Sequence, residues 1–497
     1  MQARTSSRAL SVAALLLCAS AAHAADRAAA PEPASTAPAP AASAPAAPTP
    51  AEQRLEQYRA FRRAFDAGDF AAAKPFAEQV VAMSEQQFGA EARELVNPLS
   101  NLGATHYRLG DFAAAETAFV RAVRIIDGQA SGADRSLIRP LQGLGETYLA
   151  TRQFAESAIA LKRAVDLMRN LDGLFNAEQL ETIDSLIESY VGLDRLQDAE
   201  KESQYAFRVA ESAFGRDDLR MLEPLDRHAR WFEYVGRYTT ARGLHARALQ
   251  LCESRAGRNS VLAVDALRGL ARTYYLEFIY GPEDAEAASS DIFTPTISAT
   301  GPEGRLNPDG ERALRIALES LARATPPDRR ARSATLVELG DWYLIGGNTA
   351  RAVESYKEGW TEAVAAGGDA IALLSSPRRL AYRPPSIAVS RATPSKPDEF
   401  EERFVEASFT VTRDGRVTDV STSNTDAPQN AERAVLLAVR KARYAPRLEN
   451  GETVDTVGVL LRERVLVRRG AAAPDAAPNA APAPVPAPST AEPTPLP

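Results

Sequence analysis

Residues 102–122, LGATHYRLGDFAAAETAFVRA, decide the fold. Leu102 and Gly103 precede His106 by four and three residues, which is the spacing of side chains on one face of an α-helix. The pair Gly110-Asp111 then suits a helix end that needs a positive φ. A second helix follows, with an apolar face made of Phe112, Ala115, Phe119 and Ala122. The stretch therefore predicts two helices that pack back on each other across a short turn.

The same pattern returns at a fixed interval of 42 residues. The aromatic or leucine after the turn recurs as Phe70, Phe112, Phe154, Leu196, Tyr238 and Tyr280. Three further columns keep this register: Gly103, Gly145, Ile187, Ala229 and Ala271; His106, Tyr148, Tyr190, Phe232 and Tyr274; and Ala73, Ala115, Ser157, Ala199 and Ala241. A fixed period of this length indicates a repeat protein. Small residues at 103 and 115 would let the two helices of a unit approach closely.

The unit resembles the tetratricopeptide repeat, whose usual length is about 34 residues. The longer period here predicts an extended second helix, ended by the glycines at 89, 173, 215 and 257. We expect a repeat domain over 52–366, with six units between about 55 and 285. A seventh, out of phase, covers about 330–366. The segment 281–309 breaks the register and is rich in turn formers, so we interpret it as an inserted loop.

In that family the first helix of each unit lines a concave groove that binds other proteins. The register transfers this role to positions that flank the core columns. They are Asn101, Arg108, Gln142, Glu146, Asp184, Glu188, Arg230, Glu233 and Tyr234. The groove would be mixed in sign, with Tyr234 as an anchor. The alternative for each position is an ordinary exposed helix residue.

The N-terminus reads as an export signal. Basic residues at 4 and 8 precede an apolar run from Leu10 to Ala22, which ends in Ala22-His23-Ala24. This predicts a signal peptide over 1–24 that is cleaved after Ala24. The run is shorter than the roughly 20 residues that cross a bilayer. Cys18 could mark a lipoprotein, but Leu17 stands where a small residue is expected, so a cysteine within a discarded signal is favoured.

Two low-complexity segments flank the folded parts. Residues 25–51 and 470–497 consist mostly of Ala, Pro, Ser and Thr, a composition that cannot bury a core. They act either as spacers or only as solubilising tails. The formal net charge of −7 is spread along the chain, so nothing favours a nucleic-acid partner.

The pattern changes over 378–469. Residues 404–411 alternate apolar and polar, Asp414-Gly415 suits a hairpin turn, and Val417 to Ser421 return. A helix over 431–442 and an alternating strand over 454–467 follow. The order is strand, strand, helix, strand.

This module resembles the C-terminal domain of the TonB family. The resemblance rests on Tyr382, Pro384, Phe409, Asp414, Gly415, Val417, Tyr444, Pro446 and Gly451. It implies a small periplasmic α+β domain that adds a strand to a short segment of outer-membrane transporters. Energy transducers of the family keep an N-terminal membrane helix, whereas this chain has a short cleavable signal. The family's Lys-Trp-Arg-Phe is here Lys441 to Tyr444, without the indole.

The sequence contains no catalytic constellation. No His, Cys, Asp or Glu pair has metal-ligand spacing, no glycine-rich phosphate loop follows a strand, and Gly-x-Ser-x-Gly is missing. We therefore expect no enzyme activity, no cofactor, no metal and no small-molecule substrate. Cys252 is expected to be a buried packing residue. The basic run around Arg440 and Arg443 is expected to be a solvated face.

The fold class predicted is mainly α: a helical solenoid of tetratricopeptide-like repeats followed by a small α+β domain. The leading hypothesis is a non-enzymatic periplasmic scaffold that binds envelope proteins or peptide segments through the groove and the strand-adding module. The alternative is a TonB-family energy transducer, anchored in the inner membrane, that supports outer-membrane transport. A third, an envelope enzyme built on the insert 281–309, has no nucleophile and base to support it.

Overall fold

The computed structural model describes residues 48–129, 134–281, 306–367, 371–372, 374–385 and 400–468. The predicted signal peptide, nearly all of the linker, most of the insert and the C-terminal tail lie outside the described residues. Within the described ranges, no helix is both long and apolar enough to cross a bilayer.

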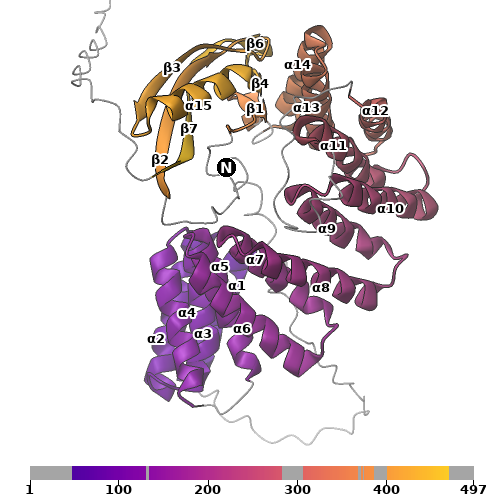
Figure 1. Cartoon of the computed structure of the whole chain (residues 1–497). Coiled ribbons are helices and arrows are strands. Elements are labelled where there is room, and N and C mark those ends of the chain that lie inside the picture. The colour runs from indigo at the N-terminus through magenta and orange to yellow at the C-terminus, as the bar shows by residue number, and fades with distance from the viewer. Residues whose placement is uncertain are drawn as a thin grey trace, which may run out of the picture. The chain divides into compact units, whose positions relative to one another are not determined.

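The described part of residues 50–366 consists of helices that pair in succession (Figure 1). The pairs are α1 (Pro50–Asp66) with α2 (Phe70–Phe88), α3 (Val96–Arg108) with α4 (Phe112–Asp127), α5 (Ile138–Ala150) with α6 (Phe154–Asp172), α7 (Leu180–Gly192) with α8 (Leu196–Phe214), α9 (Leu222–Tyr234) with α10 (Tyr238–Ala256), α11 (Val264–Tyr280) with α12 (Pro308–Ala322), and α13 (Arg329–Ile345) with α14 (Thr349–Ala366). We number these pairs as units one to seven.

The two helices of a unit meet at the small-residue column of the first helix. A Cβ atom on Gly103 would lie 2.8 Å from the Phe119 ring, and one on Gly145 would lie 2.4 Å from Leu161 Cγ. In both cases the contact is made sixteen residues later, by a side chain that is itself buried. The expected close approach is therefore present, and any larger residue at these positions would push the helices apart.

The turns within the units follow the glycine pattern. Gly68, Gly110 and Gly236 have φ of 77°, 78° and 84°, the left-handed region that favours glycine. In units three and four the same position holds Arg152 and Asp194, with φ of 61° and 58°. The predicted glycines 89, 173, 215 and 257 end the second helices with positive φ as well.

The sixth unit differs from the prediction. Tyr280 fits the 42-residue column, but it ends α11 instead of opening a second helix. The second helix of this unit is α12, which packs against α11 from beyond the insert. The insert therefore separates the two helices of one unit and does not separate two units. The reason lies in the turn: no Gly-Asp-like pair interrupts α11, so the helix continues for 17 residues.

The C-terminal domain has a three-stranded antiparallel sheet of order β3-β2-β7, made of β3 (Val417–Thr425), β2 (Phe400–Val411) and β7 (Thr456–Arg468). Val405, Ala407 and Phe409 alternate on the face of β2 that is buried, and α15 (Gln429–Lys441) covers this face with Val435 and Val439. The predicted order of strand, strand, helix, strand is confirmed.

The domain also has two small sheets, of which the sequence indicates only the turn at Asn450-Gly451. β1 (Arg378–Ala381) pairs with β4 (Arg443–Ala445), and β5 (Arg447–Glu449) pairs with β6 (Glu452–Val454) across the Asn450-Gly451 turn. Strands of three or four residues are too short to show an alternation in sequence.

The repeats and the C-terminal domain belong to one compact unit, Gln53–Pro497. Leu344 of α13 shares an apolar cluster with Leu380, Ala445 and Leu448. Lys357 Nζ of α14 lies 2.6 Å from Glu452 Oε2. The domain therefore packs on unit seven through both its small sheets.

We predict that Gly145→Ala lowers the free energy of unfolding by about 1–3 kcal/mol, because the added methyl group overlaps Leu161. Gly243→Ala on α10 is the matched control, because nothing lies within 4 Å of its Cβ position. It should raise stability by up to about 1 kcal/mol through helix propensity. Chemical denaturation followed by circular dichroism measures both changes, and a shift in the same direction for both variants would contradict the packing account.

Candidate binding surface

The first helices lie on the inner side of the repeat array. Backbone contacts join α3 to α5, α5 to α7, and α9 to α11, whereas no two neighbouring second helices of the described chain make comparably close contact. Helices that approach each other more closely line the inside of a bend. We call the row of side chains that the first helices carry on this side the inner face.

Most of the groove residues predicted from sequence bond to the first helix of the adjacent unit. Asn101 Oδ1 accepts a hydrogen bond from Arg139 at 3.3 Å, and Gln142 Nε2 donates to Thr182 Oγ1 at 2.7 Å. Glu146 accepts from Ser185, and Asp184 pairs with Arg227. These bonds span 38 to 43 residues of sequence and connect units two to five.

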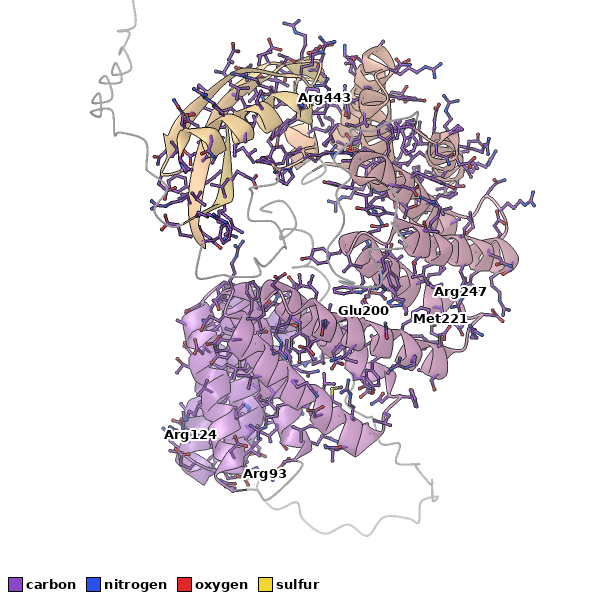
Figure 2. The ribbon with its side chains drawn as sticks, viewed as in Figure 1. Arg93, Arg124, Glu200, Met221, Arg247 and Arg443 are labelled. Atoms are coloured by element: carbon purple, nitrogen blue, oxygen red, sulfur yellow. The ribbon has the colours of Figure 1, made fainter. Side chains whose placement is uncertain are left out.

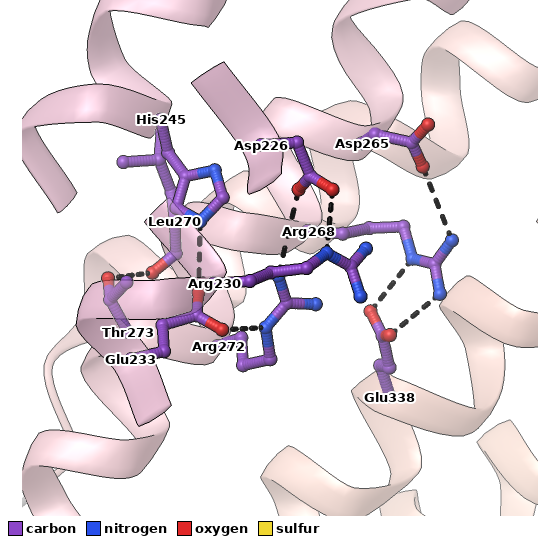
Figure 3. A network of polar contacts seen from close by, with 10 residues as sticks. All are labelled: Asp226, Arg230, Glu233, His245, Asp265, Arg268, Leu270, Arg272, Thr273 and Glu338. Atoms are coloured by element: carbon purple, nitrogen blue, oxygen red, sulfur yellow. Dashed lines mark hydrogen bonds and ion pairs between the residues drawn. The ribbon is translucent and has the colours of Figure 1, made fainter. Parts of the chain in front are cut away.

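A larger polar network joins units five, six and seven (Figure 3). Arg272 Nε of α11 donates to Glu233 Oε2 at 2.7 Å, and His245 Nε2 lies 2.9 Å from Glu233 Oε1. Next to this cluster, Arg230 Nε donates to Asp226 Oδ2 at 2.6 Å. Arg268 makes two hydrogen bonds to Glu338 of α13, at 2.9 and 2.7 Å.

Glu233 is a structural member of this network. Its side chain is 8% exposed, and His245 beneath it is 1% exposed. Burial alone raises the pKa of Glu233, but the hydrogen bond from His245 and the charge of Arg272 outweigh it, so the net pKa is lowered and the carboxylate stays charged. Removing this carboxylate would take the hydrogen-bond acceptor from Arg272 Nε and leave that guanidinium only the more distant Asp226, 4.0 Å away, which would weaken the contact between units five and six. Glu233 is therefore a poor choice for testing partner binding.

Other predicted residues remain accessible. The Arg230 side chain is 57% exposed, and Glu188 and Tyr234 are half-buried. The Tyr234 ring lies 6.0 Å from that of Trp231, and Arg108 lies over the Phe70 ring at 4.5 Å. Arg230 is therefore the predicted residue that a binding partner can reach most readily.

Sequence reasoning missed several inner-face residues. Arg227, Arg268, Arg272 and Glu338 all take part in the bonds between first helices. Tyr107 was missed too: burial and then the charge of Glu146 raise its pKa to about 12, which keeps its hydroxyl protonated. Arg268 and Arg272 hold in unit six the register positions of Asp184 and Glu188, so extending the same columns into unit six would have found them. Arg227 and Tyr107 lie within one helical turn of Arg230 and Arg108.

Contacts on the outer side also tie neighbouring units together. Three of the arginines that make such contacts are labelled in Figure 2: Arg93, Arg124 and Arg247. Arg93 Nη1 lies 2.7 Å from Asp134 Oδ2, and Arg247 Nη1 donates to Glu211 Oε1 at 2.8 Å. The Arg93 side chain is 53% exposed and the Arg247 side chain 29%, so both pairs keep contact with solvent and each contributes about 1 kcal/mol.

The TonB-like motif residues form the core and the turns of the C-terminal domain. Tyr382, Phe409, Val417, Tyr444 and Pro446 are buried, Pro384 is half-buried, and Gly415 and Gly451 adopt positive φ in the turns. The Phe409 and Tyr444 rings lie 5.4 Å apart. Asp414 pairs with Arg416 in the hairpin turn. These residues therefore shape the domain.

The sheet of this domain has two edges in the described chain, β3 and β7. β7 is the longer strand, and Val457 and Leu460 on it are 80% and 60% exposed. Arg462 lies 3.8 Å above the Phe404 ring, and Arg464 pairs with Glu402, so the exposed face of the sheet is mixed in charge. Among the described residues, no cluster of His, Cys, Asp or Glu could hold a metal ion.

Family models match both parts of the chain. The tetratricopeptide repeat model matches residues 64–127 and 99–170, and the model for the C-terminal domain of the Gram-negative bacterial TonB protein matches residues 404–460. The chain contains tetratricopeptide repeats and a TonB-type C-terminal domain. The predicted recognition and fold class are thereby confirmed.

Solved structures of repeat proteins resemble the chain at low identity. One is a putative kinesin light chain with nearly identical TPR-like repeats from Podosopora anserina: 17% identity, 42% of this chain, 99% of that one, and a TM-score of 0.39. Another is a tetratricopeptide repeat protein from Parabacteroides merdae: 15% identity, 62% and 93% coverage, and a TM-score of 0.37. No curated protein matches the chain.

The two family matches indicate the function only in general terms. Tetratricopeptide repeats are typically non-enzymatic scaffolds for protein interaction. The TonB C-terminal domain is associated with the Gram-negative envelope. Both matched parts of the chain therefore imply protein partners in general.

Proposed function

We propose that this chain is a non-enzymatic periplasmic scaffold that binds one envelope protein on its inner face and a second through its TonB-type domain. The observation that carries the proposal is the inner face itself. Accessible polar and aromatic side chains of α7 and α9 lie on a row that bonds between units hold rigid. A preorganised surface of this kind loses little entropy on binding.

The second partner would bind at the β7 edge. An exposed strand edge offers backbone donors and acceptors to an extended peptide, and its side chains add specificity. Val457 and Leu460 supply the apolar contacts. The natural ligand of such an edge is an extended segment of another envelope protein, with outer-membrane transporters as the candidates that the TonB resemblance implies.

We predict that replacing Glu188, Arg230 and Tyr234 together by alanine reduces capture of the inner-face partner by about tenfold or more, because this removes the accessible side chains and spares Glu233. Periplasmic proteins are crosslinked to the tagged full chain and quantified by mass spectrometry. The matched control replaces exposed second-helix residues Lys201, Arg208 and Gln250 by alanine and should leave capture unchanged.

Equal capture by the inner-face variant and the control would contradict the inner-face assignment. A Val457→Asp/Leu460→Asp variant separates the two sites, because it should lose partners of the C-terminal domain and keep those of the repeats.

The proposed location has its own test. Export and cleavage predict a mature chain that starts at Ala25 and is released with the periplasmic fraction, as intact mass and fractionation would report. A full-length chain that resists alkaline extraction would instead favour the energy-transducer alternative, for which the match over 404–460 is the supporting observation.

A further inference from the structure

The segment that leads into the C-terminal domain lies against the first helices of units six and seven. The Tyr275 hydroxyl of α11 donates to the backbone oxygen of Leu380 at 3.0 Å. Arg383 Nε donates to the backbone oxygen of Ile279 at 2.9 Å. Arg378 Nη1 lies 2.7 Å from Asp341 Oδ2 of α13. Residues 378–383 thus contact both first helices near their C-terminal ends.

These contacts are of the kind that a repeat protein makes to an extended peptide. One tyrosine hydroxyl donates a hydrogen bond to the backbone of the segment, one carboxylate pairs with its basic side chain, and an apolar cluster contains its leucine. Leu380 is 7% exposed and packs in the cluster that includes Leu344 and Tyr356. Extended peptides are commonly bound in this way, with main-chain hydrogen bonds for affinity and side-chain sites for specificity.

Asp341 occupies the same position in its unit as residues on the inner face of other units. A Cβ atom on Gly340 would lie 2.5 Å from the ring of Tyr356, which is sixteen residues later. Gly145 and Leu161 have the same spacing and the same kind of contact. This contact fixes the register, so Asp341, next to Gly340, corresponds to Glu146, next to Gly145. By the same register Glu188 and Arg230 hold this position in units four and five.

The ion pair is tightly enclosed. The Asp341 side chain is 10% exposed, and the Tyr356 hydroxyl donates to it at 2.8 Å. Burial raises the pKa of Asp341, and the charge of Arg378 opposes that rise. A buried carboxylate without its basic partner is strongly unfavourable, so Asp341 needs a cation at this place.

We propose that residues 378–383 are an intramolecular ligand of the inner face, and that units six and seven bind extended peptides with an arginine followed two residues later by a leucine. The segment is held twice, because Arg379 of β1 also pairs with Tyr444 of β4. A tethered segment competes at an effective concentration of about 1 mM, so the site is closed to weaker ligands in the intact chain.

This inference extends the proposed function from units four and five to units six and seven, and it rests on that proposal only for the choice of the binding side. Its assay uses a synthetic peptide and no cellular partner. If the peptide does not bind, the proposal of partner capture at Glu188, Arg230 and Tyr234 still stands. If partner capture fails, the peptide assay still tests units six and seven.

The test measures fluorescence anisotropy of a labelled peptide, SPRRLAYRPP (residues 376–385), with the full chain and its variants. Arg378→Glu places a second carboxylate beside Asp341 and should displace the internal segment. We expect this variant to bind the peptide at least about tenfold more tightly than the unmodified chain. A peptide with glutamine in place of its first arginine should not bind.

Two further variants keep the test decisive. Asp341→Arg combined with Arg378→Asp restores the internal pair with reversed charges and should again reject the peptide. Arg378→Met keeps the apolar stem of the side chain and replaces Arg378→Glu if circular dichroism shows that the latter is unfolded. Equal peptide affinity of the unmodified chain and a folded Arg378 variant would overturn the proposal.

Discussion

The close approach of the two helices within a unit, as in units two, three and seven, is the constraint on which the rest of the structure depends. Gly103, Gly145 and Gly340 each leave room for a side chain sixteen residues later, and no Cβ fits without displacing it. Paired in this way, the helices of each unit present the same faces to their neighbours. First helices then meet first helices, and their polar residues come together on the inner face.

The inner face has two kinds of polar residue. Glu233 and Asp184 hold neighbouring first helices together, whereas Arg230 stays largely exposed. The first kind fixes the positions of the second, which is the preorganisation that binding requires. In unit seven the corresponding position, Asp341, pairs with Arg378 of the chain's own strand β1. The chain thus places a basic extended segment where the repeats of other units would hold a partner.

The sequence columns predicted the helix pairs, the glycine turns and the order of strands in the C-terminal domain, because local periodicity and turn chemistry determine them. For unit six the prediction was wrong: Tyr280 fits the column of residues that open second helices, but no turn precedes it, so it ends α11. Positions on the inner face could be predicted from the register, but their partners could not, because each bond reaches a helix about 40 residues away. β1 left no signal, since its four residues are set by contacts with α11, α13 and β4.

Site-specific photocrosslinking tests the central claim most directly. A photoreactive residue is placed in the full chain at Glu188 or Arg230 on the inner face, and at Lys201 or Gln250 on the second helices, in a Gram-negative host. If the inner face is the binding surface, partner adducts will form at Glu188 and Arg230 and not at the second-helix positions. Adducts confined to Lys201 and Gln250 would contradict the account.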